Sequence, residues 1–329
     1  MTALAPTLQA FFTQRLASQR NASPHTVAAY RDTFRLLLGF VQQTTATPPA
    51  KLELEDLDAP LVGAFLDHLE SDRGVSAATR NARLAAVHSL FRFAALRHPE
   101  HAAVIQRVLA IPAKRTGRPV VCYLTKPEID ALLAAPDLAT RTGRRDRALL
   151  LVAIQTGLRV SELAGLRRQD VVLGTGAHVS CTGKGRKQRS TPLTSQTATV
   201  LRAWMHESGG GAAGPVFPGP SGKPLSRDAI SRLVARHAAT AVAFCPSIAT
   251  KKVAPHVLRH SCAMQLLQAG VDCAVIALWL GHESIRTTDI YEHADPRLKE
   301  RALERTARPR TPRGRYRPPD TLLAFLEAL

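Results

Sequence analysis

Apolar positions three and four residues apart predict that the first third of the chain is helical. Ser23 and Pro24 have the residue types preferred at a helix N-cap and first turn, and an apolar stripe follows them at Val27, Tyr30, Phe34, Leu37, Leu38 and Val41. Ser76 precedes a second run, whose apolar face comprises Leu84, Val87, Leu90, Phe91 and Ala94. Two shorter helices are expected over residues 5 to 19 and 59 to 71.

The second part of the chain mixes helical and strand patterns. Helices are expected over residues 126–135, 146–156, 226–243, 255–268 and 271–280, and the nearly all-apolar 146–156 is expected to be buried. Residues 177–181 and 189–193 are typical of two short strands around a glycine-bearing hairpin loop. The pattern therefore predicts a mainly α protein with a small antiparallel β-hairpin or sheet.

The segment between these parts carries proline, glycine and basic residues, as an exposed connection does. A chain of 329 residues is also long enough for two domains. We expect a helical domain over 1–112, a linker over 113–125, a second domain over 126–300, and a basic tail over 301–329. The tail ends in a short apolar helix too small to form a core, so it should dock on its own subunit or on a neighbour.

Charge is the one unusual feature of the composition. Lys and Arg number 44 against 26 Asp and Glu, which gives a net charge of +18 and a pI near 10.6. Such an excess favours a polyanionic partner, because neutralising phosphates releases condensed counterions. The polar faces of the first helices carry Arg31, Arg35, Arg80 and Arg83, which we expect to contact DNA phosphates. A merely solvated basic face is the alternative.

Other classes of protein are excluded by simple patterns. The longest apolar run has eight residues, Cys273 to Leu280, and a membrane span needs about 18 or more. The five cysteines form no CxxC pair, and the first twenty residues lack the features of a secretion signal. We expect a cytoplasmic protein. Aromatic residues make up only 5%, which favours contact with duplex DNA over base stacking on single strands.

Five segments of the second half resemble, in their order along the chain and in their residues, the catalytic domain of the tyrosine recombinases, also called the phage integrase family. They are Thr156-Gly-Leu-Arg159-Val-Ser-Glu162-Leu, Thr182-Gly-Lys184-Gly, His256-Val-Leu-Arg259-His260, Leu280-Gly-His282 and Asp289-Ile-Tyr291. The resemblance covers roughly residues 124 to 295, with a weaker likeness over 5 to 112 to the family's helical core-binding domain. It implies a two-domain recombinase, Xer-like or a transposase, with an α+β catalytic domain.

The arginines of these segments suit phosphoryl transfer. Attack on a phosphodiester concentrates negative charge on the non-bridging oxygens, and the permanently charged forks of Arg159 and Arg259 match those oxygens. Glu162, three residues after Arg159, is spaced to hold that fork in position. Arg186, Lys187 and Arg189 at the hairpin are further candidates for phosphate contact.

His256 and Arg259 share one helix face, and Pro255 favours a helix start just before them. His256 and His260 also have the i, i+4 spacing of zinc helices, but a cation at 259 and the Val-Leu pair between them argue against a metal. By resemblance, His256 assists proton transfer near the nucleophile, and His260 packs or bonds structurally.

The resemblance makes Tyr291 the nucleophile. A phenol has an ordinary pKa near 10, so it needs a base or a field of cations to attack at neutral pH, and His256, His282 and the two arginines are placed to help. The resemblance also favours Lys184, at the hairpin tip, as the acid that protonates the departing 5′ oxygen. The six expected catalytic residues are thus Arg159, Lys184, His256, Arg259, His282 and Tyr291, with no metal and no cofactor.

The function implied is site-specific cleavage and rejoining of double-stranded DNA through a 3′-phosphotyrosine link, in recombination, integration or transposition of mobile DNA. In the family two domains clamp the duplex and four subunits exchange strands, so a homotetramer on DNA is expected, with partner recombinases a further possibility. Two alternatives stay open: a non-catalytic DNA-binding accessory protein of the same fold, and a type IB topoisomerase-like activity.

Overall fold

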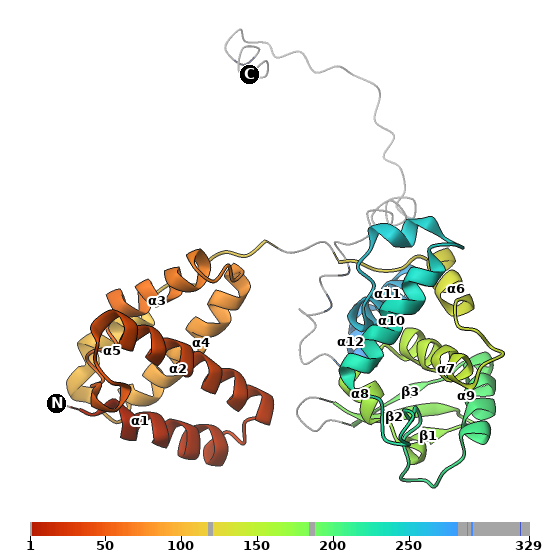
Figure 1. The fold of residues 1–329 in the computed structure, drawn as a ribbon, viewed down its shortest axis with the longest axis horizontal. Helices are drawn as coiled ribbons and strands as arrows, with labels where there is room; N and C mark the ends of the chain where they lie inside the picture. The colour runs from red at the N-terminus through yellow and green to blue at the C-terminus, as the bar shows by residue number, and fades with distance from the viewer. Residues whose placement is uncertain are drawn as a thin grey trace. The chain divides into compact units, whose positions relative to one another are not determined.

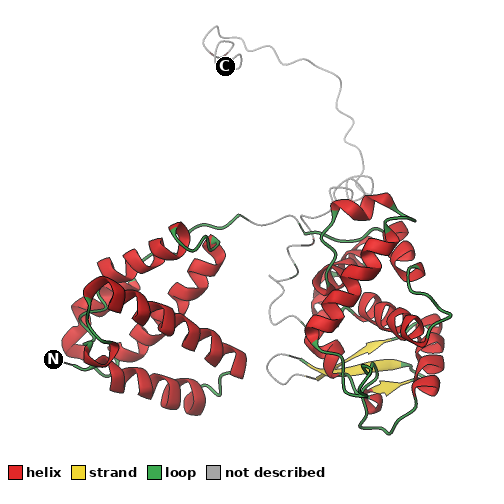
Figure 2. Cartoon of the chain, viewed as in Figure 1, coloured by secondary structure: helices red, strands yellow, loops and turns green. Residues whose placement is uncertain are grey.

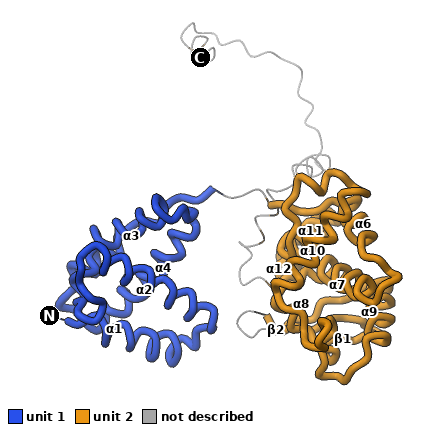
Figure 3. The backbone as a smooth tube through the Cα atoms, in the orientation of Figure 1, with its two compact units in different colours: residues 1–118 blue, residues 119–329 orange. Residues whose placement is uncertain are grey.

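The computed structural model describes residues 2–117, 121–183 and 188–281, together with Thr288, Tyr291 and Leu323. The chain divides into two compact units, Met1–Arg118 and Pro119–Leu329 (Figure 3). This division falls inside the segment 113–125, where the sequence predicts a linker. The C-terminal tail expected over 301–329, apart from Leu323, lies outside the described residues.

The first unit is built from helices whose starts are set by local capping (Figure 1). Its elements are α1 (Leu4–Ala10), which runs on as a π-helical segment (Phe11–Gln19), α2 (Pro24–Thr45), α3 (Ala59–Ser71), α4 (Ala77–Ala95) and α5 (Ala102–Leu109). The predicted caps are confirmed, because Ser23 Oγ accepts from Thr26 N at 3.2 Å and Ser76 Oγ accepts from Thr79 N at 3.3 Å. Each cap satisfies an N–H that the helix itself leaves unpaired.

The arginines of this unit do not all lie where the pattern placed them. Arg31 and Arg35 are exposed on α2, as expected. Arg80 does not lie on an exposed polar face, because only 6% of the residue is exposed and its Nη1 donates to the carbonyl of Pro112 at 3.1 Å. Arg83 is half-buried, and its Nη1 joins α4 to α2 through Thr33 Oγ1 at 2.9 Å. Phosphate contact by any of them stays a prediction.

The second unit sets seven helices around a small sheet, within the described ranges (Figure 2). The helices are α6 (Lys126–Ala134), α7 (Arg141–Thr156), α8 (Val160–Gly165), α9 (Ser195–Ser208), α10 (Arg227–Ala241), α11 (Pro255–Gln268) and α12 (Cys273–Leu280). Strands β1 (Val171–Val172), β2 (His178–Thr182) and β3 (Gln188–Pro192) form an antiparallel sheet in the order β1-β2-β3. The predicted mainly α fold with a small antiparallel sheet is confirmed.

Helix α7 passes through the core of the second unit and ends at the segment that carries Arg159. Leu149, Leu150 and Val152 are fully buried on it, which confirms the predicted buried helix. The helix ends at Gly157, whose φ of 62° and ψ of 25° are left-handed. A side chain there would also meet Leu280 at 2.5 Å, so glycine lets α7 stop against the end of α12.

Two buried carboxylates tie the helices of this unit together. Asp146 on α7 is fully buried and contacts Arg145, Arg236 and His237, each at 2.8 Å. Glu128 on α6 accepts from Lys251 Nζ at 2.6 Å. Buried charges need such partners, so both clusters fix the scaffold on which the functional residues stand.

Candidate active site

Arg159 is the N-cap residue of α8, two positions after the glycine that ends α7. Its main-chain N–H donates to Glu162 Oε2 at 2.8 Å, and its Nη1 donates to Glu162 Oε1 at 3.0 Å. The side chain of Arg159 keeps 34% of its surface exposed, whereas that of Glu162 keeps 6%. The predicted pairing is therefore present, and it holds a partly exposed guanidinium on a buried carboxylate.

A second arginine binds the same carboxylate from the sheet. Arg189 on β3 donates through Nη1 to Glu162 Oε1 at 3.1 Å and through Nη2 to Oε2 at 2.7 Å, and its side chain is 11% exposed. Burial pushes the pKa of Glu162 upward, but hydrogen bonds from Arg189 and Arg159 outweigh it, so that pKa lies below its usual value. Arg189 was expected to be an accessible phosphate contact, and the structure instead buries it as a support for Glu162.

Gly281 brings the end of α12 against these arginines. Its carbonyl accepts from Arg159 Nη2 at 3.1 Å, and its left-handed φ of 66° ends the helix. A Cβ at this position would lie 2.8 Å from Arg189 Nη1. Glycine is thus required both by the backbone conformation and by the close approach of Arg189.

Arg259 on α11 is the most deeply buried of the three arginines. Only 3% of it is exposed, and it donates through Nη1 to the carbonyl of Gly157 at 2.6 Å and through Nη2 to that of Leu280 at 2.7 Å. Burial, followed by the charge of Arg159, lowers the pKa of Arg259 to about 10. The guanidinium is therefore still charged at neutral pH, and its two bonds tie α11 to the ends of α7 and α12.

Tyr291 lies against α11, where His260 contacts its hydroxyl. Tyr291 is 1% exposed, and its hydroxyl is 3.0 Å from His260 Nδ1. The ring of His256, one turn earlier, lies 4.2 Å from that of His260 between centroids. The pKa of His256 is lowered by its partial burial and, to a smaller extent, by the charges of Arg259 and Arg159. The histidine that bonds the tyrosine is thus His260, for which the resemblance implied only a structural role.

The arginines act electrostatically on the phenol of Tyr291. Burial raises the pKa of Tyr291 to about 12, while the positive charges of Arg259 and Arg159 act in the opposite direction. Arg159 and Arg259 bind the consecutive carbonyls of Gly281 and Leu280, and Tyr291 belongs to the same apolar cluster as Leu280. Four other predicted residues, Lys184, Arg186, Lys187 and His282, lie outside the described residues.

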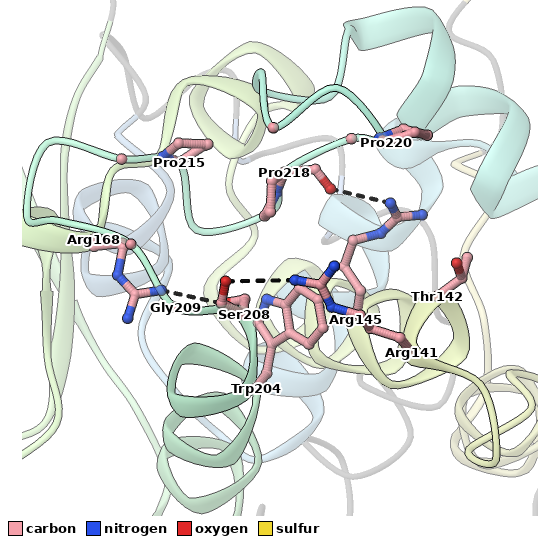
Figure 4. A pocket seen from close by; sticks show the side chains of 14 residues that line it. Arg141, Thr142, Arg145, Arg168, Trp204, Ser208, Gly209, Pro215, Pro218 and Pro220 are labelled. Carbon is pink, nitrogen blue, oxygen red and sulfur yellow. Dashed lines mark hydrogen bonds between the residues drawn. The ribbon is translucent and has the colours of Figure 1, made fainter.

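A hollow of about 410 Å³ lies at the opposite end of α7, which is about 24 Å long (Figure 4). There Arg145 donates to the carbonyl of Pro218 at 3.1 Å, and Arg141 lies over the Trp204 ring at 5.9 Å. None of the predicted site residues is among the described residues that line it. The described residues also contain no group of three or more His, Cys, Asp or Glu arranged to hold a metal ion.

Comparison with known proteins agrees with this geometry. The sequence profile described as "Phage integrase family" matches residues 122–297, and that of "Phage integrase, N-terminal SAM-like domain" matches residues 10–98. The chain belongs to the phage integrase family. An integrase/recombinase of Sinorhizobium fredii, named y4rC, is 55% identical over 99% of this chain and 98% of its own length. A tyrosine recombinase XerC of Xanthomonas campestris is 35% identical over 86% of this chain and 83% of its own.

Solved structures share the fold of this phage integrase family member. The XerH site-specific recombinase in its post-cleavage complex gives a TM-score of 0.70 at 22% identity, over 87% of this chain and 81% of its own. The Tn1549 transposon integrase with circular intermediate DNA gives a TM-score of 0.68 at 16% identity, over 91% and 99%. Within the described ranges, no helix has the length and apolar character of a membrane-spanning segment.

Proposed function

We propose that this phage integrase family member cleaves and rejoins double-stranded DNA through a 3′-phosphotyrosine link formed by Tyr291. One observation carries the proposal: Arg159 and Arg259 bind consecutive carbonyls at the end of α12, those of Gly281 and Leu280. The two arginines are 100 positions apart in the sequence, and Tyr291 belongs to the apolar cluster that contains Leu280, with its hydroxyl on His260 next to Arg259. A phenol beside two fixed cations is the arrangement that attack on a phosphodiester requires.

Both guanidinium groups retain donors for a phosphate. Each carries five N–H groups, and Arg159 and Arg259 each use two side-chain nitrogens on the described protein acceptors. The other N–H groups are available to the non-bridging oxygens, whose charge grows as Tyr291 attacks. A charge-assisted bond is worth about 1.5 to 3 kcal/mol, so loss of either arginine should slow cleavage at least about tenfold.

The remaining steps follow the same proposal. As the Tyr291 oxygen bonds to phosphorus, its proton passes to His256, the bond from phosphorus to the 5′ oxygen breaks, and Lys184 supplies the proton to that oxygen. His256 and His282 assist at the phosphate. The ester conserves the bond energy, so a free 5′ hydroxyl of the same or another strand can reverse the reaction without a nucleotide cofactor or metal.

Relatives support DNA as the partner. XerH has been solved bound to palindromic difH, and a lambda integrase dimer bound to a COC′ core site. We propose that residues 1–112 bind the duplex, that residues 126–300 carry the chemistry, and that the tail 301–329 docks on its own subunit or on a neighbouring copy. Assembly as a homotetramer on DNA, with or without a partner recombinase, belongs to the same proposal, as does a role in recombination or transposition.

Covalent capture tests the proposal without knowledge of the target sequence. A pool of duplexes with randomised sequence, each nicked so that cleavage releases a short fragment, is incubated with the full chain, and adducts that survive detergent are recovered and sequenced. We expect enrichment of a defined site, with chelator present or absent. Tyr291→Phe should bind the recovered site but form no adduct, whereas Tyr30→Phe, in the first unit, should form it normally.

Each alternative gives a different result in these assays. Sequence-specific binding without any adduct from the wild type would indicate a non-catalytic DNA-binding protein. Relaxation of supercoiled plasmid without strand exchange between two sites would indicate a topoisomerase-like enzyme. An adduct that persists in Tyr291→Phe would refute Tyr291 as the nucleophile, and loss of cleavage with chelator would refute the metal-free account.

A further inference from the structure

A histidine outside the proposed catalytic set contacts the proposed nucleophile directly. His260 Nδ1 lies 3.0 Å from the Tyr291 hydroxyl oxygen, and the two rings meet edge to face with centroids 5.5 Å apart at 66°. A separation of 3.0 Å is a normal hydrogen-bond distance. Since Tyr291 is almost fully buried, this bond also satisfies a hydroxyl that packs among apolar side chains such as Met264 and Leu280.

The protonation states of the pair decide which group donates. Burial, followed by the neighbouring His256 and Arg259, lowers the pKa of His260 to about 4, so the ring is neutral at pH 7. The pKa of Tyr291, raised to about 12 by burial, keeps the phenol protonated. With both groups neutral, the tautomer of His260 sets the direction of the bond. In the tautomer with the hydrogen on Nε2, to which the inference below assigns His260, the hydroxyl donates to the lone pair of Nδ1.

These two pKa values indicate that His260 orients the Tyr291 hydroxyl and does not remove its proton before attack. The pKa of the His260 imidazolium is lowered and that of the Tyr291 phenol is raised, so the proton stays on the tyrosine before attack. A hydroxyl has one hydrogen and two lone pairs. When the hydroxyl hydrogen points at His260 Nδ1, the two lone pairs of the Tyr291 oxygen point away from His260.

We propose that His260 is a further catalytic residue, whose Nδ1 accepts the hydrogen bond of the Tyr291 hydroxyl and so fixes the direction in which the oxygen presents its lone pairs to phosphorus. The inference rests on the proposed function of Tyr291. The neighbouring Arg259 keeps α11 in place through its two carbonyl bonds, and the ring of His256 packs 4.2 Å away. His260 thus reaches the oxygen from a fixed helix.

Two substitutions at position 260 test the orienting role. His260→Asn keeps an acceptor close to the position of Nδ1 but has no titratable ring, and His260→Leu keeps the bulk without an acceptor. Single-turnover adduct formation is measured on the recovered nicked duplex, with DNA affinity and thermal unfolding in parallel. We expect the Leu variant to form the adduct about 10- to 100-fold more slowly and the Asn variant to stay within a few-fold of wild type. Both should bind DNA normally.

The outcomes separate this inference from the proposed function. A Leu variant as fast as wild type would overturn the inference, and so would an Asn variant as slow as Leu, because that result would indicate that His260 must take the proton. Failure of the proposed function would be visible elsewhere, as an adduct in Tyr291→Phe, which retains His260.

If His260→Leu fails to fold, a measurement that does not depend on catalysis still tests the inference. The ¹⁵N resonance of His260 Nδ1 in the DNA-free full chain reports whether that nitrogen accepts a hydrogen bond. We expect it to shift in Tyr291→Phe toward the value of an unbonded imine nitrogen, with Nε2 still protonated. An unchanged Nδ1 resonance would overturn the inference.

Discussion

Replacement of Gly281 by alanine should damage both stability and cleavage, although glycine and alanine differ by one methyl group. The new Cβ would lie 2.8 Å from Arg189 Nη1 and 3.2 Å from its Cδ and Cζ. An exposed arginine would swing aside. The side chain of Arg189 is 11% exposed and donates two hydrogen bonds to Glu162, so it can move only by weakening those hydrogen bonds.

The expected magnitude has two parts. A residue with a Cβ in the left-handed backbone region lowers the free energy of unfolding by about 1 to 2 kcal/mol. Disturbing one charge-assisted bond between Arg189 and the buried Glu162 adds about 1.5 to 3 kcal/mol. Gly281→Ala should therefore lose about 2.5 to 5 kcal/mol of unfolding free energy. The matched control is Gly270→Ala, which has a φ of +84° and no described atom within 4 Å of its new Cβ, and which should lose only the first part.

Urea unfolding of both variants measures the difference, and adduct formation on the nicked duplex measures its consequence. Glu162 and the carbonyl of Gly281 both hold Arg159, so we expect Gly281→Ala to cleave at least about tenfold more slowly and Gly270→Ala to cleave normally. If the two variants lost equal stability and both cleaved like wild type, Arg189 would not be a rigid support and the reasoning would be refuted.

Three further predictions concern stability, pH and DNA binding. Asp146→Ala should lose about 3 to 5 kcal/mol of unfolding free energy in urea, because it leaves the nearly buried guanidinium of Arg145 without its carboxylate; an unchanged midpoint would contradict this. The pKa of His260 is lowered to about 4 in the folded protein, so between about pH 6.5 and 4 only the unfolded chain binds a proton at this residue. The free energy of unfolding should therefore fall by at most about 3 kcal/mol over this range. Thermal unfolding of His260→Asn should show a pH dependence that lacks this contribution. Arg80→Ala should lower stability, whereas Arg35→Ala should leave stability unchanged but weaken duplex binding, with a salt slope shallower by about 0.9.

The parts of the fold that the sequence predicted are those with local signals. The helices after Ser23 and Ser76 were predictable because a capping hydroxyl and a periodic apolar face lie within one segment. Helix α9 (Ser195–Ser208) was not, because its first turns are rich in threonine and β-branched residues, which weaken the helical signal. Its apolar face becomes clear only where Leu201 and Trp204 pack into the core.

The errors at arginines have a similar origin. Arg80 lies four residues before Leu84 and seven before Val87, so it belongs to the buried stripe of α4, and helix periodicity alone could have shown this. Arg189 could not have been placed in this way. Its partner Glu162 lies 27 positions earlier and on another element, and a basic residue beside a hairpin tip is ordinarily exposed.

The candidate site has a property that no single segment reveals. Arg159 and Arg189 bind one buried carboxylate, Glu162, and Arg259 binds the carbonyls of Gly157 and Leu280 instead of a carboxylate. The pKa of Arg259 falls to about 10 because burial and the charge of Arg159 both disfavour its charged form. Among the described residues the site thus has more positive charge than its carboxylate balances, which is unfavourable without an anion. On the proposed function, a phosphodiester between Arg159 and Arg259 would supply that anion, and the charge that develops during the proposed attack by Tyr291 would be stabilised further. The same excess of positive charge would therefore favour DNA binding and, more strongly, the transition state.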